Sequence, residues 1–434
     1  MTLRLDLTDP GFEEKFQQFL GAKRETEQDV DDAAAAIIAD VRKRGDTALR
    51  ELTLKFDRFD LSEHPMRIGR REIDHWAGQC DAETLAALSV AATRIRAFHK
   101  KQLPDDLDFI DEAGIRLGYR WGAVDAAGLY VPGGTAAYPS SVLMNALPAK
   151  VAGCRRLVMV VPTPDGVVNP LVMAAAKLAG VDEVYRIGGA QAVAALAYGT
   201  ETIKPVDKIV GPGNAYVAAA KRRVFGVVGI DMIAGPSEIL VLADGANDPA
   251  WIAADLLSQA EHDTAAQAIL VTDDAGFADA VAAAVESHLK TLPRAATARE
   301  SWNAHGAIFT VPSLDAGLPL VDRVAPEHLE IAAEGARDLG SRVKNAGAIF
   351  MGRFVPEALG DYLAGPNHVL PTARSARFSS GLGVLDFMKR TSMIECDAEG
   401  LAQVGDAAIS LARAEGLDAH ALSLSIRLNR GPGS

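Results

Sequence analysis

Short strand-like runs alternate with alanine-rich helical segments along most of this chain, and this alternation limits its possible folds more than any other feature. Segments such as 141–152 and 190–196 have helical composition and separate the runs. The expected strands form two series, residues 123–131, 157–161, 184–187 and 208–210, then 239–242, 268–272, 307–311 and 347–350. Alternation of this kind is typical of βαβ units around a parallel sheet. We therefore expect two α/β sheets, one after the other.

The remaining segments predict helices towards both ends. Residues 11–56 and 82–103 repeat Leu, Ala, Ile and Phe at helical spacing with charges between them, which indicates amphipathic helices. After Pro366 the pattern is irregular until a helical stretch that begins near Leu401. We expect this last stretch to be a small terminal appendage.

Composition argues against several functional classes. Asp and Glu number 57 against 44 Lys and Arg, a formal charge of -13, which disfavours non-specific binding to nucleic acid or to an anionic membrane. No run approaches the ~18–20 apolar residues of a membrane span, and the first residues lack the apolar stretch of a signal peptide. The three cysteines, Cys80, Cys154 and Cys396, are too few for a disulfide framework. We expect a cytoplasmic protein that binds neither nucleic acid nor membrane.

A helix that ends in a polar pair is the first candidate site. Asp248 is its expected N-cap and Pro249 its expected first residue. At ~100° per residue, Gln259 and His262 lie about 60° apart on a face separate from the apolar stripe. Both side chains are therefore able to address one metal ion or ligand. A solvated polar face with a hydrogen-bonded glutamine is the alternative, because Gln is an uncommon metal ligand.

Acidic and histidine side chains in the C-terminal half are further candidates. Glu327 and His328 are adjacent after a proline, and a histidine with a reference pKa of ~6.5 suits proton abstraction while the carboxylate orients it or activates water. An ordinary helix start is the alternative there. Asp361 is expected on a short helix near the carboxyl edge of a sheet, where ligand sites gather. His368 and His420 lie in polar segments, although a lone histidine is more often structural than a ligand.

Three glycine-rich turns each join an expected strand to a helix, at residues 129–141, 187–191 and 210–215. Such turns direct backbone amides and a helix N-terminus toward a phosphate group. The dinucleotide fingerprint G-x-G-x-x-G and the P-loop are both missing from the sequence. Ordinary tight turns of an α/β domain therefore explain these segments at least as well as a nucleotide site does.

Taken together, these segments resemble the histidinol dehydrogenase family. Residues 230–242, IDMIAGPSEILVL, resemble its signature. The other matching segments follow in the family's order: 129–141, 187–191, 210–214, 258–263, 325–330, 365–377 and 415–420. The similarity spans nearly the whole chain, and long motifs in a fixed order are highly specific.

The resemblance implies an activity with its cofactors. It implies a zinc-dependent, NAD-linked homodimer with one zinc ion per subunit, which oxidises L-histidinol to L-histidine through L-histidinaldehyde and uses two NAD for four electrons. By motif, the implied zinc ligands are Gln259, His262, Asp361 and His420, a mixed N/O set that suits zinc.

The resemblance also assigns the remaining site residues. His328 is implied to remove the alcohol proton, and Glu327 to activate the water that hydrates the aldehyde. The implied cofactor-contacting residues are Tyr130, Gln191 and Asn214. The implied substrate-contacting residues are Ser237, Gln259, His262, His328, Asp361, Glu415 and His420.

The fold implied by the resemblance is two incomplete Rossmann-like domains with parallel sheets, plus small helical N- and C-terminal elements exchanged in a homodimer. The implied division is residues 1–25 as an N-terminal helical arm, 26–129 with 238–380 as the α/β domain carrying most metal and catalytic residues, 130–237 as the NAD-binding α/β domain, and 381–434 as a small C-terminal domain. Glu415 and His420 would then complete the site of the partner subunit.

Alternatives to this interpretation stay open. A relative that oxidises another small hydroxylated substrate, such as a sulfonated propanediol, shares most motifs, although Glu415 and the intact Glu327–His328 pair favour histidinol. A zinc hydrolase would activate metal-bound water, but the sequence lacks H-E-x-x-H. A periplasmic-type binding protein would need a signal peptide. Cys154 stands before two arginines that would lower a thiol pKa, yet no acid/base partner adjoins it in the motifs, so we expect it to be structural.

Overall fold

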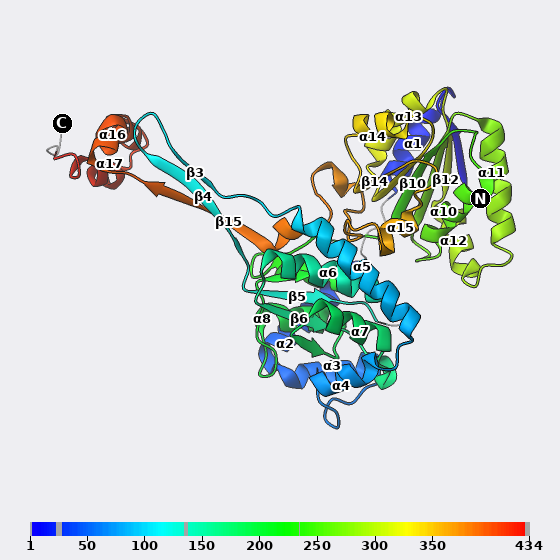
Figure 1. Cartoon of the computed structure of the whole chain (residues 1–434), viewed down its shortest axis with the longest axis horizontal. Helices are drawn as coiled ribbons and strands as arrows, with labels where there is room; N and C mark the ends of the chain where they lie inside the picture. The colour runs from blue at the N-terminus through cyan, green and yellow to red at the C-terminus, as the bar shows by residue number, and fades with distance from the viewer. Residues whose placement is uncertain (1, 23–27, 134–137, 234, 430–434) are drawn as a thin grey trace.

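The computed structural model describes residues 2–22, 28–133, 138–233 and 235–429, which form two α/β domains and a long arm (Figure 1). The fold class expected from the sequence is confirmed: the larger sheets are mainly parallel with helices on their faces. Across the described residues, no helix is both long enough and apolar enough to cross a membrane.

The first domain, called the β10 domain, has a six-stranded parallel sheet. The strand order is β1 (Leu3–Asp6), β12 (Ala307–Thr310), β11 (Gln267–Thr272), β10 (Glu238–Ala243), β13 (His328–Ala332) and β14 (Ala348–Met351). One face carries α1 (Phe12–Gly21), α13 (Leu314–Val324) and α14 (Ala336–Arg342). The other carries α10 (Pro249–Ala260), α11 (Ala275–His288) and α12 (Ala295–His305). The short α15 (Glu357–Tyr362) follows β14.

The second domain, called the β5 domain, has its own six-stranded sheet. The order is β2 (Arg67–Ile68), β7 (Glu183–Tyr185), β6 (Arg156–Val160), β5 (Ala126–Tyr130), β8 (Lys208–Val210) and β9 (Gly229–Ile230), with only the β2–β7 pair antiparallel. One face carries α4 (Arg70–Ala77), α5 (Ala82–Lys100), α6 (Pro139–Ala152) and α7 (Pro170–Ala179). The other carries α2 (Gln28–Arg44), α3 (Asp46–Asp57), α8 (Gly189–Tyr198) and α9 (Ala215–Val224).

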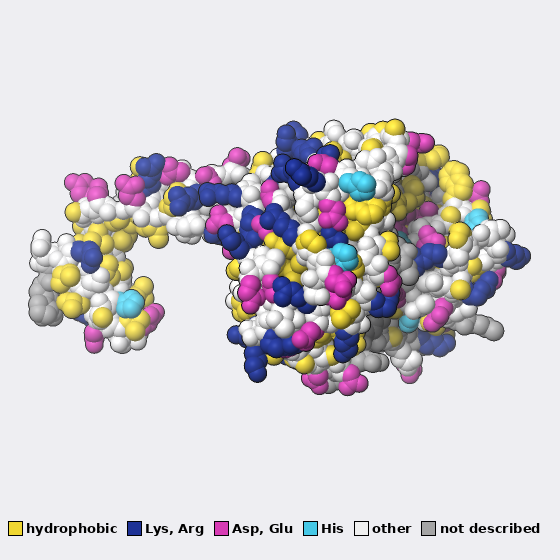
Figure 2. Space-filling view, turned by 90° about the horizontal axis from the view of Figure 1, so that it is seen from below, with side chains coloured by type: hydrophobic (Ala, Val, Ile, Leu, Met, Phe, Trp, Pro, Cys, Tyr) yellow, Lys and Arg dark blue, Asp and Glu magenta, His cyan; other side chains and the backbone are white. Residues whose placement is uncertain are grey.

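The arm projects from the β5 domain (Figure 1). It consists of the antiparallel strands β3 (Leu107–Ile110), β4 (Arg116–Ala123) and β15 (Met388–Glu395), followed by α16 (Ala398–Ala414) and α17 (Asp418–Ser425). Yellow apolar side chains are visible along it in Figure 2. Its most exposed apolar residues are Ile110, Ile394, Leu411 and Ile426. A surface of this kind is typical of one covered by another chain.

The implied domain division is wrong in two places. Helices α2 to α5 were assigned to the domain of residues 238–380, but they pack on the sheet of the β5 domain. Both faces of that sheet are buried, and the helices that connect its parallel strands do not cover them completely. Helices α2 to α5, which come earlier in the chain, cover the remaining area. The N-terminal segment is not a separate arm either, because β1 pairs with β12 and Phe16 of α1 is fully buried.

Candidate active site

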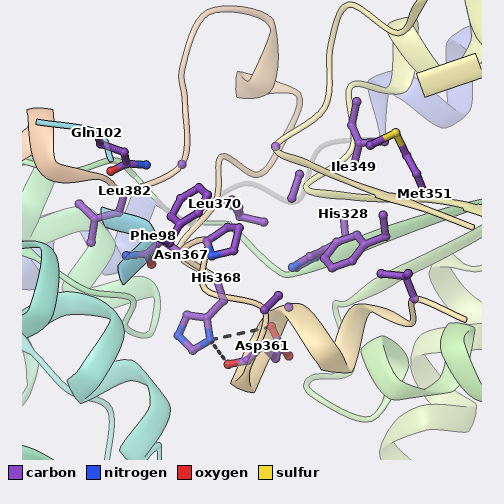
Figure 3. A pocket seen from close by; sticks show the side chains of 18 residues that line it. Phe98, Gln102, His328, Ile349, Met351, Asp361, Asn367, His368, Leu370 and Leu382 are labelled. Atoms are coloured by element: carbon purple, nitrogen blue, oxygen red, sulfur yellow. Dashed lines mark hydrogen bonds and ion pairs between the residues drawn. The ribbon is translucent and has the colours of Figure 1, made fainter. Parts of the chain in front are cut away.

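A cavity of about 500 Å³ lies between the two domains, where β14 and α15 face the end of α5 (Figure 3). The β10 domain contributes His328 and Asp361 to its wall, and Phe98 and Gln102 come from the other side. The cavity therefore combines ionisable groups on one wall with an aromatic and an amide side chain on the opposite one.

His328 is the first residue of β13 and points into this cavity (Figure 3). Its Nδ1 lies 3.0 Å from the carbonyl oxygen of Glu238 and donates to it. This bond leaves Nε2 as the unprotonated nitrogen, and Nε2 is buried without a hydrogen-bond partner among the described residues. Burial lowers the pKa of His328 to about 4, so the ring is neutral near pH 7. A neutral imidazole with a free Nε2 is a proton acceptor.

Glu327 lies beside His328, but its carboxylate is held differently. Its Oε2 accepts a hydrogen bond of 2.9 Å from the backbone N–H of Glu238 and lies 3.8 Å from Nδ1 of His328. Glu327 and His328 are therefore neighbouring buried groups, as expected, and each forms a hydrogen bond with the backbone of Glu238 at the start of β10. The alternative of an ordinary helix start at this point is wrong, because β13 begins at His328.

Glu357 is a site residue that the motif comparison missed. It opens α15 four residues before Asp361, so both side chains lie on one face of that helix. Ligand atoms of His328, Glu357 and Asp361 all lie within 4.8 Å of one another, close enough for one cation. The i, i+4 spacing of the two acids in residues 357–361 was the signal that could have revealed it.

Several carboxyl groups lie close together around Glu357, which is itself buried. Burial raises the pKa of Glu357 well above its usual value, and nearby Asp361, Glu330, Glu327 and Asp255 raise it further. Burial likewise raises the pKa of Glu330. All four charges acting on Glu357 are negative, and buried carboxylates are costly unless a cation compensates them. The chemistry of this donor set therefore fits a metal ion.

Gln259 and His262 join the same cluster from the end of α10. Asp248 caps that helix and Pro249 opens it, as the sequence predicts. In the amide orientation that satisfies both neighbours, the Gln259 oxygen accepts from Nδ1 of His262 at 3.1 Å and its nitrogen donates to Glu357 Oε1 at 2.6 Å. Gln259 is fully buried, so the alternative of a solvated polar face is wrong for this residue.

His368 has a different part in the cavity wall. Its Nδ1 lies 3.1 Å from the carbonyl oxygen of Asp361 (Figure 3). Its Nε2 lies 3.3 Å from the hydroxyl of Ser141 in α6. Both ring nitrogens are thus engaged, one with each domain. His368 joins the two walls of the cavity.

This cluster lies at the amino edge of the β10-domain sheet, and the expectation that Asp361 lies near a carboxyl edge is wrong. His328 and Glu238 are the first residues of their strands. Helix α10 follows β10 and runs back along the sheet, so Gln259 at its end reaches the amino edge. Helix α15 also runs back, because the backbone N–H of Glu357 at its start donates to Glu330 within β13.

The structure does not bring every expected site residue together within one chain. His420 on α17 and Glu415 at the end of α16 are exposed at the far end of the arm, remote from the cavity (Figure 1). Ser237 directly precedes β10, where its carbonyl accepts from Gln267, and it does not line the cavity walls that the structure describes. The three expected residues Gln259, His262 and Asp361 do lie in one cluster.

A second cavity of about 420 Å³ lies at the carboxyl edge of the β5-domain sheet. Tyr130, Gln191 and Asn214, which the motifs group together, all line it. The Tyr130 hydroxyl accepts a hydrogen bond of 3.0 Å from the backbone N–H of Gly189, and burial raises the pKa of Tyr130 to about 12. Asn214 caps α9 through the N–H of Val217. Part of the first glycine-rich turn, residues 134–137, lies outside the described residues.

The turn after β8 shows why glycine is needed there. Gly211 has φ of +111°, and a Cβ on it would lie 2.1 Å from the carbonyl oxygen of Tyr130. Its carbonyl accepts a 2.9 Å bond from Lys221, and its N–H donates a 2.8 Å bond to Asp231. Lys221 and Asp231 form a buried ion pair. The ion pair therefore fixes both the N–H and the carbonyl group of Gly211. This glycine lies at the junction between β5 and β8, where the strand order reverses.

Cys154 lies outside both cavities. It is buried at the end of α6, and burial raises the pKa of its thiol to about 11. The thiolate form that a nucleophile requires is therefore disfavoured near neutral pH.

Comparison with known proteins agrees on one family. The family profile of histidinol dehydrogenase matches residues 21–428. A histidinol dehydrogenase from Rhodospirillum rubrum is 64% identical over 432 residues, covering 99% of this chain and 100% of the relative. One from Rhizobium meliloti is 62% identical over 431 residues, covering 99% of each. A crystal structure of the enzyme from Elizabethkingia anophelis has a TM-score of 0.93 at 33% identity, covering 99% of this chain and 98% of that one.

Proposed function

This chain belongs to the histidinol dehydrogenase family, and from that premise we propose how its two cavities divide the reaction. The family consists of NAD-dependent oxidoreductases that catalyse the final two oxidation steps of histidine biosynthesis. The hydrolase and binding-protein alternatives are therefore wrong. We assign L-histidinol and a zinc ion to the cavity of His328, and NAD to the cavity of Tyr130.

The observation that carries this proposal is the unpartnered Nε2 of His328 inside a buried acidic cluster. This nitrogen would accept the proton of the substrate alcohol and later that of the aldehyde hydrate, and bound NAD would supply the hydride acceptor for both oxidations. Glu327, anchored on the start of β10, takes a proton from the water that adds to the aldehyde. No covalent intermediate with the protein is needed.

The metal site would be made by Gln259, His262 and Asp361 of one chain with His420 of a second. A zinc ion held by these residues would supply a Lewis acid that binds nitrogen groups of the substrate. Glu357 adds negative charge next to this set. The acidic surroundings favour a cationic amino alcohol and disfavour an anionic sulfonated one, which supports histidinol as the substrate.

NAD fits the cavity at the carboxyl edge of the β5-domain sheet. Ligands of open α/β sheets bind there, at the point where the strand order reverses. The N-terminus of α8, which lines this cavity at Ala190 and Gln191, would supply backbone amides toward a pyrophosphate. Tyr130, Gln191 and Asn214 supply the polar side chains around it.

Dimerisation completes the site in this proposal. Ser237, Glu415 and His420 would contact substrate, the last two from the partner's arm. The exposed apolar residues of that arm support burial against a second subunit. The unpaired cysteines fit a cytoplasmic enzyme.

Complementation between two inactive variants tests this assignment. His328→Asn and His420→Asn homodimers are each expected to be inactive with histidinol and NAD. After mixed refolding, a heterodimer carries both changes in one site and none in the other, so about a quarter of wild-type activity returns if subunits pair at random. No recovery from folded heterodimers would show that His420 acts within its own chain or not at all.

Chelation tests the metal in the same assay. Removal of the metal is expected to abolish NAD reduction, and added zinc is expected to restore it. Full activity of metal-free protein would contradict the zinc assignment.

A further inference from the structure

Asp57 is an ionisable group in the second cavity to which no motif assigns a role. It ends α3 and lines the cavity beside Tyr130, Gln191 and Asn214. The residue is only 9% exposed. Its Oδ2 is buried and has no hydrogen-bond partner among the described residues.

The surrounding contacts hold this carboxylate in place without pairing with it. The next residue, Arg58, points its guanidinium at Asp165, with Nε 2.7 Å from Oδ1. Phe59 packs under Gly166, where an added Cβ would lie 2.8 Å from its ring. Asp165 and Gly166 belong to a 3₁₀ turn, Pro164–Gly166, that follows β6. The end of α3 is thus anchored over the carboxyl end of β6.

Other acids in the same domain show how a purely structural carboxylate is satisfied. Asp207 accepts from the backbone N–H of Ala126 at 2.9 Å, and Asp182 accepts from that of Leu157 at 2.8 Å. Burial raises the pKa of Asp57, since a buried carboxylate without donors is disfavoured. Donors on a bound molecule would remove this cost.

The place of Asp57 in the fold indicates which donors these are. In dinucleotide-binding sheets, an acidic residue near the end of the strand next to the central one accepts hydrogen bonds from ribose hydroxyls. Here β6 adjoins β5, and Asp57 reaches that point from a helix that precedes the sheet in the chain. We propose that the Asp57 carboxylate binds the ribose hydroxyls of the adenosine half of NAD and rejects a 2′-phosphate, so that it sets cofactor preference. This inference rests on the proposed assignment of the cavity to NAD.

Binding measured by calorimetry on the intact protein tests the proposal without turnover. The probes are NAD, NADP and nicotinamide hypoxanthine dinucleotide, which lacks the adenine amine. Wild type is expected to bind NAD at least 10-fold more tightly than NADP. Asp57→Asn is expected to weaken NAD about 10-fold, because charge-assisted bonds are lost, and to leave NADP unchanged or tighter. The preference for NAD should therefore collapse.

Controls separate this result from loss of fold and from a wrong cavity. Asp60→Asn makes the same change three residues along and outside the cavity lining, and should leave both affinities unaltered. Equal melting temperatures of Asp57→Asn and wild type show that the fold persists. Gln191→Ala should weaken NAD and NADP alike if the cavity is the cofactor site.

Four outcomes would overturn the proposal. If Asp57→Asn binds NAD as tightly as wild type while Gln191→Ala binds it more weakly, the proposed role of Asp57 is wrong but the cavity remains the NAD site. If both variants bind NAD as tightly as wild type, the assignment of the cavity to NAD is wrong. An equal loss for NAD and NADP means that Asp57 does not contact the 2′ position. If Asp57→Asn and wild type bind nicotinamide hypoxanthine dinucleotide equally tightly, Asp57 contacts the adenine amine and not the ribose.

Discussion

The two α/β domains carry their cavities at opposite edges of their sheets. In the β5 domain the cavity lies at the carboxyl edge, where glycine-rich turns place backbone groups such as the N–H of Gly189. In the β10 domain the acidic cluster lies at the amino edge, where side chains from returning helices meet the first residues of strands, such as His328. Similar sheets therefore present two chemically different surfaces.

This difference follows from how each edge is built. A turn at a carboxyl edge leads directly into a helix N-terminus, whose free amides and dipole favour a phosphate. An amino edge receives helix C-termini, which offer carbonyl groups and no such amides, so recognition depends on side chains. The first arrangement suits a dinucleotide, and the second suits a cation and its amino-alcohol ligand.

The largest effect is expected from His328→Asn, which tests whether the amino-edge site depends on one side chain. Loss of the proton acceptor should lower the rate of NAD reduction about 10²- to 10⁴-fold, while zinc content stays at the wild-type level. Metal analysis of the purified variant accompanies the assay. A parallel loss of zinc would mean that His328 is a ligand, as its closeness to Glu357 and Asp361 allows.

Lys221→Met tests the support behind the carboxyl-edge turn. The change leaves Asp231 buried and unpaired, which costs about 3–5 kcal/mol and should lower the melting temperature by several degrees. Lys177→Met is the matched control, because Lys177 pairs with Asp74 on the surface and such pairs contribute under ~1 kcal/mol. Equal melting temperatures of the two variants would contradict a supporting role for the buried pair.

Gly211→Ala asks whether the backbone itself makes the carboxyl-edge site. A side chain at this positive φ, in contact with the Tyr130 carbonyl, should cost about 2–4 kcal/mol and weaken NAD binding. Gly226→Ala has a similar φ of +101° but open space around it, so it isolates the strain from the clash. NAD titration by calorimetry should show weaker binding only for Gly211→Ala.

The smallest effect is expected from Cys154→Ser, because this thiol lines neither the cavity of the β5 domain nor that of the β10 domain. Its pKa is raised to about 11, so the thiol stays protonated at pH 8 and the nucleophilic thiolate forms only as the pH approaches that value. Activity should change less than about twofold, and iodoacetamide at pH 8 should label the exposed Cys396 in preference. Selective loss of aldehyde oxidation in the variant would refute a water-based second step.

Much of the fold could be predicted from the sequence, and the errors have physical causes. The eight expected strands correspond to β5, β6, β7, β8, β10, β11, β12 and β14. Most of them are buried on both faces and are therefore continuous apolar runs. Strand β13 was missed because a proline and a glutamate before it imitate a helix start. The arm strands were missed because side chains such as Phe109 and Ile394 are exposed in this chain, so its pattern lacks a buried face.

The sequence by itself determined the alternation of strands and helices, the caps of helices such as α10, and, through ordered motifs, the family. These are local properties, since periodicity, caps and turn residues act over a few positions. The tertiary structure decided which helices cover which sheet, that the acidic cluster lies at an amino edge, that Glu357 joins Asp361, and that Asp57 enters the second cavity. Those facts depend on packing between segments that are distant in the sequence. This packing is set by the burial of whole helix and sheet faces, so it cannot be inferred from the residue at any single position.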